Sequence, residues 1–181
     1  MARSQLVVHH SADPSQTPQF DKINGYHKRK GFPKSSLGYW AGYHVLIEPS
    51  GEVRQARALT DHGAHTAAMC DGGHCNSVAY GVCLAGDFTK ADPRPEQLAA
   101  LYMFWKSLGY PKILLHSDVK KTGCPGKYPF KNELQIRWLA DIHQQLKNAV
   151  RALPRFLGTL RGNMLGRKIE RLENIVDENE H

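Results

Sequence analysis

The sequence contains no apolar run of about eighteen residues, so it predicts no membrane-spanning helix. Its first residues, Met1 to His9, also lack the long hydrophobic segment and the small-residue cleavage site of a secretory signal peptide. No internal repeat is visible, and neither is a known nucleic-acid-binding motif. Taken as a complete gene product, the chain is therefore expected to start in a cytoplasm.

Cysteine is scarce, with 4 residues in a chain of 181. That density is too low for a disulfide scaffold, and a chain of this length can bury a core without one. Cys83 stands within the apolar run 78–84 and is predicted to be a buried, inert thiol. Cys70 and Cys75 flank a glycine-rich loop and could form a disulfide, hold a second metal with His74, or stay free. Inside a cell we expect free thiols.

The charge is unbalanced, with 24 Lys and Arg against 17 Asp and Glu and a net charge of +7. Such a balance favours polyanionic partners, namely nucleic acid, an anionic membrane or an acidic cell-wall polymer, and charge alone does not choose among them. Apolar residues make up 41% of the chain and charged residues 23%. This composition predicts one domain of ordinary size with a real core, plus an appendage.

Hydrophobic periodicity and turn residues predict alternating strands and helices. The apolar run 5–10 predicts a short buried strand, and a helix is expected over 17–30 with Thr17 as its N-cap. Further strands are predicted at 43–48, 52–57, 78–84 and 113–115, and further helices at 95–108 and 131–149. The expected fold class is α/β (α+β), a single domain with a mixed central sheet of about five strands covered by helices.

The composition changes after Pro154. Residues 155–169 contain basic residues without an acid, and residues 170–181 reverse the sign, with more acidic than basic residues. We therefore expect a domain over 1–150 and a charged C-terminal helical extension over 151–181. This extension could dock on the domain or fray, or it could be a cationic amphipathic segment in weak contact with a membrane or an anionic polymer.

Two histidine-bearing segments carry the chemistry. His9 stands at the end of the first predicted strand, and His116 follows the strand 113–115, with Cys124 eight residues later. Two imidazoles and one thiolate suit a single zinc ion that keeps a fourth position open for water. An open zinc site is typical of catalysis, so this pattern predicts hydrolysis with zinc activating the water.

Four segments follow one another in a specific order and spacing, although each alone would be a weak signal. They are Val8–Ala12, Gly42–Ile47, His65 with Asn76 and Tyr80–Phe88, and His116 with Cys124–Gly126. Together they resemble the zinc-dependent N-acetylmuramoyl-L-alanine amidase family, which includes the phage lysozyme-type endolysins and the peptidoglycan recognition proteins. The resemblance covers the chain from about residue 5 to residue 130.

The resemblance implies a role for each matching residue. His9, His116 and Cys124 take the positions of the three metal ligands, with one Zn²⁺ per chain. Tyr43 matches an active-site tyrosine that hydrogen-bonds water or the substrate oxygen. Thr122 falls where relatives carry lysine or threonine to stabilise the developing oxyanion. The neighbouring Lys121 could act in its place.

The remaining polar candidates have less definite roles. The resemblance places His65 in the substrate groove, where it could contact the substrate or support a metal ligand from behind, and Asn76 is a weaker candidate for the same groove. His10 is expected to flank the site because successive side chains of a strand point to opposite faces, and His44 is expected to point away from the site for the same reason. The other histidines are expected on the surface or in loops: His27, His62, His74 and His143.

The resemblance also implies the reaction: hydrolysis of the amide bond between N-acetylmuramic acid and L-alanine in bacterial peptidoglycan. We expect a monomeric lytic amidase, a phage endolysin that stays in the host cytoplasm until lysis and then degrades the cell wall. The alternatives are a non-catalytic peptidoglycan-binding protein, a cytoplasmic amidase that recycles wall fragments, and a protein whose basic surface also binds another macromolecule. No nucleic-acid partner is predicted.

Overall fold

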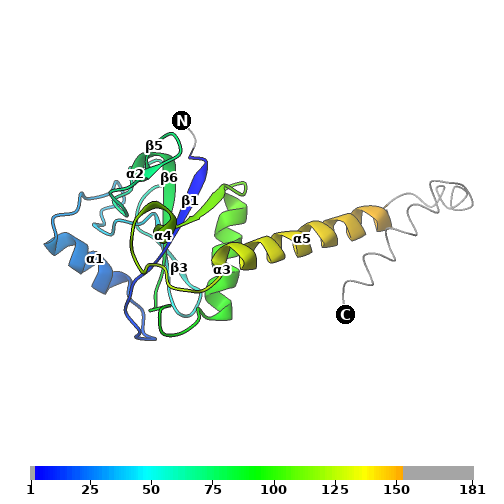
Figure 1. Cartoon of the computed structure of the whole chain (residues 1–181), viewed down its shortest axis with the longest axis horizontal. Helices are drawn as coiled ribbons and strands as arrows, with labels where there is room; N and C mark the ends of the chain where they lie inside the picture. The colour runs from blue at the N-terminus through cyan, green and yellow to red at the C-terminus, as the bar shows by residue number, and fades with distance from the viewer. Residues whose placement is uncertain (1–2, 153–181) are drawn as a thin grey trace, which may run out of the picture. The chain divides into compact units, whose positions relative to one another are not determined.

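The computed structural model describes residues 3–152 of the chain, and it has a mixed five-stranded sheet at its centre (Figure 1). The strand order is β3-β2-β6-β1-β7. Four strands run parallel, and β3 pairs antiparallel with β2 at one edge. The strands are β1 Gln5–His10, β2 Val45–Ile47, β3 Val53–Gln55, β6 Ala79–Leu84 and β7 Lys112–Leu115. The expected sheet and fold class are confirmed.

The two central strands are buried along almost their whole length. All six residues of β1 are buried, and β6 has a single half-buried position. Parallel strands with helices on both faces are apolar on both sides, which explains the continuous hydrophobic runs in the sequence. Along β1 and β6, His9 pairs with Cys83 and His10 with Leu84, so the two histidines project to opposite faces of the sheet.

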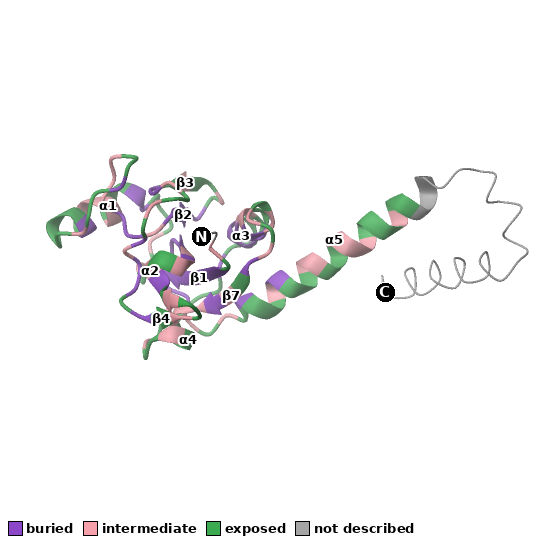
Figure 2. Ribbon diagram, turned by 90° about the horizontal axis from the view of Figure 1, so that it is seen from above, coloured by how far each residue is buried: buried purple, intermediate pink, exposed green. Residues whose placement is uncertain are grey.

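Helices α1, Phe20–Arg29, and α3, Pro95–Ser107, lie on opposite sides of the central strands (Figures 1 and 2). On the face of His9, Phe20 from α1 packs with Leu46 and Cys83. The other helices are α2 Cys75–Val78, α4 His116–Val119 and α5 Phe130–Ala152, and a small second sheet pairs β4 Met69–Cys70 with β5 Gly73–His74. None of the helices in the described part is long and apolar enough to cross a membrane.

Helix α1 begins later than the sequence predicts, and the expected cap at Thr17 is wrong. Gln19 takes the N-cap position, and the cap comes from a distant residue. The buried carboxylate of Glu48 accepts hydrogen bonds from the backbone N–H groups of Gln19 (2.8 Å) and Phe20 (2.9 Å). A carboxylate satisfies the free N–H groups of a helix N-terminus and complements its dipole, so this tertiary contact replaces the local cap.

The chain divides into two compact units, Met1–Leu134 and Gln135–His181. The first unit contains the whole sheet and ends with the fully buried Phe130 and Leu134 at the start of α5. The expected boundary after residue 150 falls within the second unit. The predicted charged extension lies outside the described residues from position 153 onward.

Candidate metal centre

Adjacent parallel strands deliver the two predicted histidine ligands to the same edge of the sheet. Val8 of β1 pairs with Leu115, the last residue of β7, and each is followed by a histidine: His9, still in β1, and His116, the first residue of α4. Their rings lie 4.4 Å apart between centroids. Because parallel strands end at one edge, a separation of about a hundred residues in the sequence becomes a side-by-side contact in space.

Cys124 completes the cluster from the loop that follows α4. Its Sγ lies 3.9 Å from Nδ1 of His9. One ligand atom from each of His9, His116 and Cys124 lies within 4.8 Å of the others. The structure therefore brings together the three residues for which the sequence predicts a metal.

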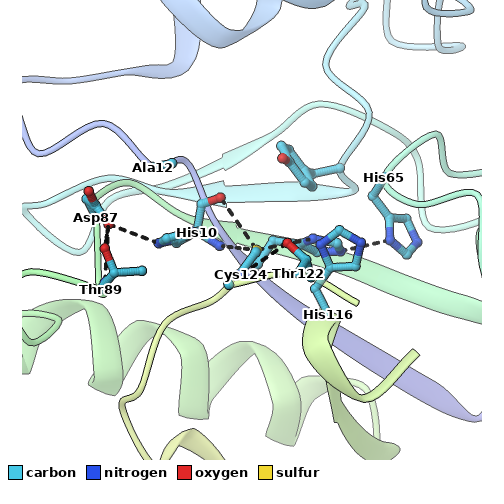
Figure 3. Close-up of a pocket in the computed structure, with 11 residues that line it drawn as sticks. His10, Ala12, His65, Asp87, Thr89, His116, Thr122 and Cys124 are labelled. Atoms are coloured by element: carbon cyan, nitrogen blue, oxygen red, sulfur yellow. Dashed lines mark hydrogen bonds and ion pairs between the residues drawn. The ribbon is translucent and has the colours of Figure 1, made fainter. Parts of the chain in front are cut away.

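A pocket of about 420 Å³ opens over this cluster (Figure 3). Figure 3 shows Cys124, Thr122 and His116 gathered together, with His65 on one side of them and His10 and Asp87 on the other. The lining residues are His9, His10, Ala12, Tyr43, His65, Asp87, Thr89, His116, Thr122, Gly123 and Cys124. Of the predicted site residues, Asn76 and the alternative Lys121 are not among them.

The electrostatic setting fits a divalent metal with nitrogen and sulfur ligands. Burial, followed by the neighbouring His65 and His116, lowers the pKa of His9 well below its usual value, so His9 is neutral and can offer a lone pair. Burial raises the pKa of Cys124 to about 11, while the backbone N–H of His10 donates to its sulfur at 3.3 Å and favours the thiolate. A bound dication would supply the charge that holds the thiolate deprotonated. Two neutral imidazoles and one thiolate are a donor set that suits Zn²⁺.

Two consecutive residues, His65 and Thr66, lie against the Nε2 atoms of His9 and His116. His9 Nε2 lies 3.0 Å from His65 Nδ1, and His116 Nε2 lies 3.1 Å from Thr66 Oγ1. The side-chain oxygen of Asn76 accepts hydrogen bonds from the backbone N–H groups of His65 (2.9 Å) and Thr66 (3.1 Å). Asn76 thus holds the backbone behind the pocket. The sequence did not single out Thr66, and the only signal for it was its place next to His65.

Tyr43 and Thr122 both line the pocket on which the predicted ligands converge. The ring of Tyr43 lies 5.2 Å from the ring of His9. Burial, followed by the Cys83 and Cys124 thiols, raises the pKa of Tyr43 well above its usual value, so its phenol stays neutral. Thr122 Oγ1 accepts a hydrogen bond from the backbone N–H of Cys124 at 3.2 Å, and its own O–H remains able to donate. Lys121 is exposed and is not among the residues that line the pocket.

An acidic group lines the far side of the pocket and was not predicted. Asp87 accepts a hydrogen bond from the hydroxyl of Thr89 at 2.6 Å and pairs with Lys90 at 3.1 Å. The hydrogen bonds from Thr89 and Lys90 lower the pKa of Asp87 to about 2. Its position three residues after the end of the buried strand β6 was the available signal, because polar pocket residues gather near strand ends.

The histidines outside the ligand cluster differ in their surroundings. His44 faces away from the pocket, as expected: its Nδ1 accepts from the backbone N–H of Gly81 at 2.9 Å. His62 and His74 are exposed, also as expected, and His143 is half-buried. The prediction for His27 is wrong. Its ring is buried and stacks on the ring of Phe32, with 4.2 Å between the centroids. The side of α1 that carries His27 packs against the loop before β2.

Cys70 and Cys75 form a disulfide, so the expectation of free thiols is wrong. The tight hairpin of β4 and β5 turns at Asp71 and Gly72, and Gly72 has the positive φ (87°) that glycine adopts readily. This turn brings the two cysteines to a Cα–Cα distance of 4.9 Å, within the range that a disulfide requires. Cys83 is a buried free thiol, as predicted.

The fold and the site define an α/β protein with a candidate His/His/Cys metal centre at the carboxyl edge of its parallel strands. Comparison with known families makes this more specific: the model described as N-acetylmuramoyl-L-alanine amidase matches residues 2–127. The chain belongs to this family. No curated protein sequence is significantly similar to it.

Solved structures with the same fold include bacterial, phage and insect proteins. N-acetylmuramoyl-L-alanine amidase LysC from Clostridium intestinale is 28% identical, with a TM-score of 0.58 over 74% of this chain and 83% of its own. The Ph2119 endolysin of a Thermus scotoductus bacteriophage is 23% identical, with a TM-score of 0.55 over 75% and 84%. Drosophila PGRP-LB is 24% identical, with a TM-score of 0.58 over 72% and 78%.

Proposed function

We propose that this protein is a zinc-dependent amidase that hydrolyses the bond between N-acetylmuramic acid and L-alanine in bacterial peptidoglycan. The observation that carries the proposal is the convergence of His9, His116 and Cys124 on one open pocket. Family membership supports the choice of bond, as does the 28% identity to a Clostridium N-acetylmuramoyl-L-alanine amidase. The net charge of +7 favours approach to an anionic cell wall.

The three ligands would hold one Zn²⁺ per chain, and the ion would supply Lewis acidity toward a carbonyl and lower the pKa of water toward about 7. The residues of the chain do the rest. Tyr43 presents a neutral phenol that can donate to, and so orient, the substrate carbonyl or the attacking water. Thr122 lines the same pocket, where donation from its hydroxyl to the developing oxyanion would stabilise the transition state.

We propose a lytic role, as a monomeric phage endolysin made in the host cytoplasm and acting on the wall at lysis. Support comes from a Clostridium relative described as an endolysin amidase, which is 28% identical to this chain. The pocket needs no second copy, because one chain supplies all three metal-binding candidates.

Release of amino groups from purified peptidoglycan tests the activity. The wild-type protein is expected to release new L-alanine amino groups. This release should stop when a chelator is added and resume when Zn²⁺ is restored. Cys124→Ser is expected to be inactive, while His74→Ala, which removes an exposed imidazole outside the pocket, is expected to match the wild type. Binding to peptidoglycan without chelator-sensitive release would instead favour the non-catalytic alternative.

A further inference from the structure

We propose that His65 and Thr66, both held by Asn76, form a positioning clamp that sets the orientation and tautomer of the two candidate zinc-binding histidines. The clamp selects, for His65, the second of the two roles that the sequence left open. It gives Asn76 a role different from the substrate contact that the sequence suggested, and it gives Thr66 a role for the first time. The inference rests on the proposed zinc site, so its test also has to measure that site.

The two histidines meet the clamp through the same ring nitrogen. His9 meets His65 through Nε2 at 3.0 Å, and His116 meets Thr66 through Nε2 at 3.1 Å. His9 Nδ1 faces Cys124 Sγ at 3.9 Å. A metal takes the lone pair of a ring nitrogen, so the opposite nitrogen must carry the hydrogen and donate it. A hydrogen-bond acceptor beside Nε2 therefore selects the tautomer with the hydrogen on Nε2 and a lone pair on Nδ1, which can then bind the metal.

The backbone that carries the clamp is fixed on both sides. Asn76 Oδ1 accepts from the N–H groups of His65 and Thr66, and the backbone N–H of Gly63 donates to the Asn76 carbonyl at 2.8 Å. One loop segment therefore presents two consecutive side chains to two ligands that come from different strands. A shift of this segment would disturb both histidines together.

The ring of His65 has little room to move. A Cβ on Gly81 would lie 2.4 Å from its Cδ2 and Cγ, and a Cβ on Gly63 would lie 2.6 Å from its Cδ2. Two glycines thus leave the space that the ring fills, and both His65 and Thr66 are more than nine-tenths buried. A buried and sterically confined acceptor is what the precise orientation of a metal-binding imidazole requires.

Paired substitutions separate the hydrogen bond from the shape of each side chain. Thr66→Val keeps the shape and removes the acceptor, and Thr66→Ser keeps the hydroxyl. His65→Phe keeps a ring without nitrogen, and His65→Asn keeps an acceptor near the position of Nδ1. The readouts are Zn²⁺ affinity by chelator competition and the absorption spectrum of the Co²⁺-loaded protein, with circular dichroism of the metal-free form to check the fold.

Thr66→Val and His65→Phe are expected to bind Zn²⁺ about 10–100-fold more weakly and to alter the Co²⁺ spectrum, as loss of a partner behind a ligand typically does. Thr66→Ser and His65→Asn are expected to restore most of the affinity. If Thr66→Val binds Zn²⁺ like the wild type while Cys124→Ser does not bind it, the clamp is wrong and the zinc site stands. If the wild type and Cys124→Ser both fail to bind Zn²⁺, the proposed function fails as well.

Discussion

Two groups of histidines in this protein differ in how their ring nitrogens are used. In the pocket group, the Nε2 atoms of His9 and His116 each lie within hydrogen-bond distance of a side chain, and Nδ1 of His9 faces the Cys124 sulfur. In the packing group, Nδ1 of His44 accepts a hydrogen bond from the backbone N–H of Gly81, and its Nε2 hydrogen-bonds to the Asp61 carbonyl. His27 accepts from the backbone N–H of Gly42 and stacks on Phe32.

Burial does not separate the two groups, since it lowers the pKa of histidines in both. The difference lies in the partners of the ring. A histidine whose nitrogens are used by backbone groups stabilises the fold, and one with a nitrogen left in an open pocket can bind a ligand. Substitutions in the pocket group should therefore weaken metal binding with little effect on stability, and substitutions in the packing group should lower stability with little effect on metal binding.

The largest effect is expected for His116→Ala in the pocket group. Loss of one of three ligands should cost more than loss of a partner behind a ligand, so Zn²⁺ affinity and amidase activity should fall by more than about 100-fold. The midpoint of urea denaturation of the metal-free protein should change little. Elemental analysis and denaturation of the same samples measure both quantities. A zinc content equal to that of the wild type would remove His116 from the ligand set.

A substitution in the packing group should give the reverse pattern. His44→Ala leaves the buried N–H of Gly81 without its acceptor, while the carbonyl of Asp61 keeps its contact with Arg3, so the free energy of unfolding should fall by about 1–3 kcal/mol. Zinc stoichiometry at saturating metal should stay at that of the wild type. Urea denaturation in chelator, with a separate zinc titration, checks both. Loss of zinc without loss of stability would place His44 in the pocket group.

Acid should lower the free energy of unfolding of the metal-free protein through protonation of the packing histidines, His27 and His44. Burial lowers the pKa of both His27 and His44 to about 4, below the value of 6.5 for a free histidine. The unfolded chain therefore binds more protons between pH 6.5 and pH 4, so the stability present above pH 6.5 is lost as the pH falls through this range. Each histidine should contribute a slope of about 1.4 kcal/mol per pH unit.

Urea denaturation in chelator across this pH range measures the slope. The His44→Ala variant should lose the part of the slope that His44 contributes, so the difference between the two proteins should shrink as the pH approaches 4. A difference that is independent of pH would mean that His44 stays protonated, or exposed, in the folded state.

The sequence predicts the sheet and the ligand cluster well for a common reason. Apolar runs predict parallel strands, and the residue that follows each run, His9 or His116, must then lie at the carboxyl edge. Features set by tertiary contacts could not be predicted in this way. The capping of α1 by Glu48 and the burial of His27 depend on segments that meet only in the folded chain.

The disulfide and Thr66 were missed for a different reason. Cys70 and Cys75 are brought together by a hairpin too short to show strand periodicity, and the expectation of free thiols came from an assumed compartment rather than from geometry. Thr66 carries no signal of its own, because a threonine acts as a hydrogen-bond acceptor only when the fold places a donor against it.

The smallest effect is expected from reduction of the Cys70–Cys75 disulfide, and it should change only the pocket group, through Zn²⁺ binding. Cys75 directly precedes Asn76, which holds the backbone of His65 and Thr66, so the reduced hairpin should loosen the contacts behind the pocket histidines. A loop this short contributes only about 2 kcal/mol to stability. We expect reduction to weaken Zn²⁺ binding by less than the loss of Thr66 or His65 does, that is, by less than about 10-fold.

The packing histidines give the matching control, since neither His27 nor His44 contacts the hairpin through the hydrogen bonds described above. Zinc titration of the Cys70→Ser/Cys75→Ser double variant, which avoids a reducing agent that itself binds metal, measures the effect on the pocket. The acid slope of the same variant measures the effect on packing and should equal that of the wild type. A changed slope with unchanged zinc affinity would show that the hairpin supports the packing group instead, and the separation between the two groups would then fail.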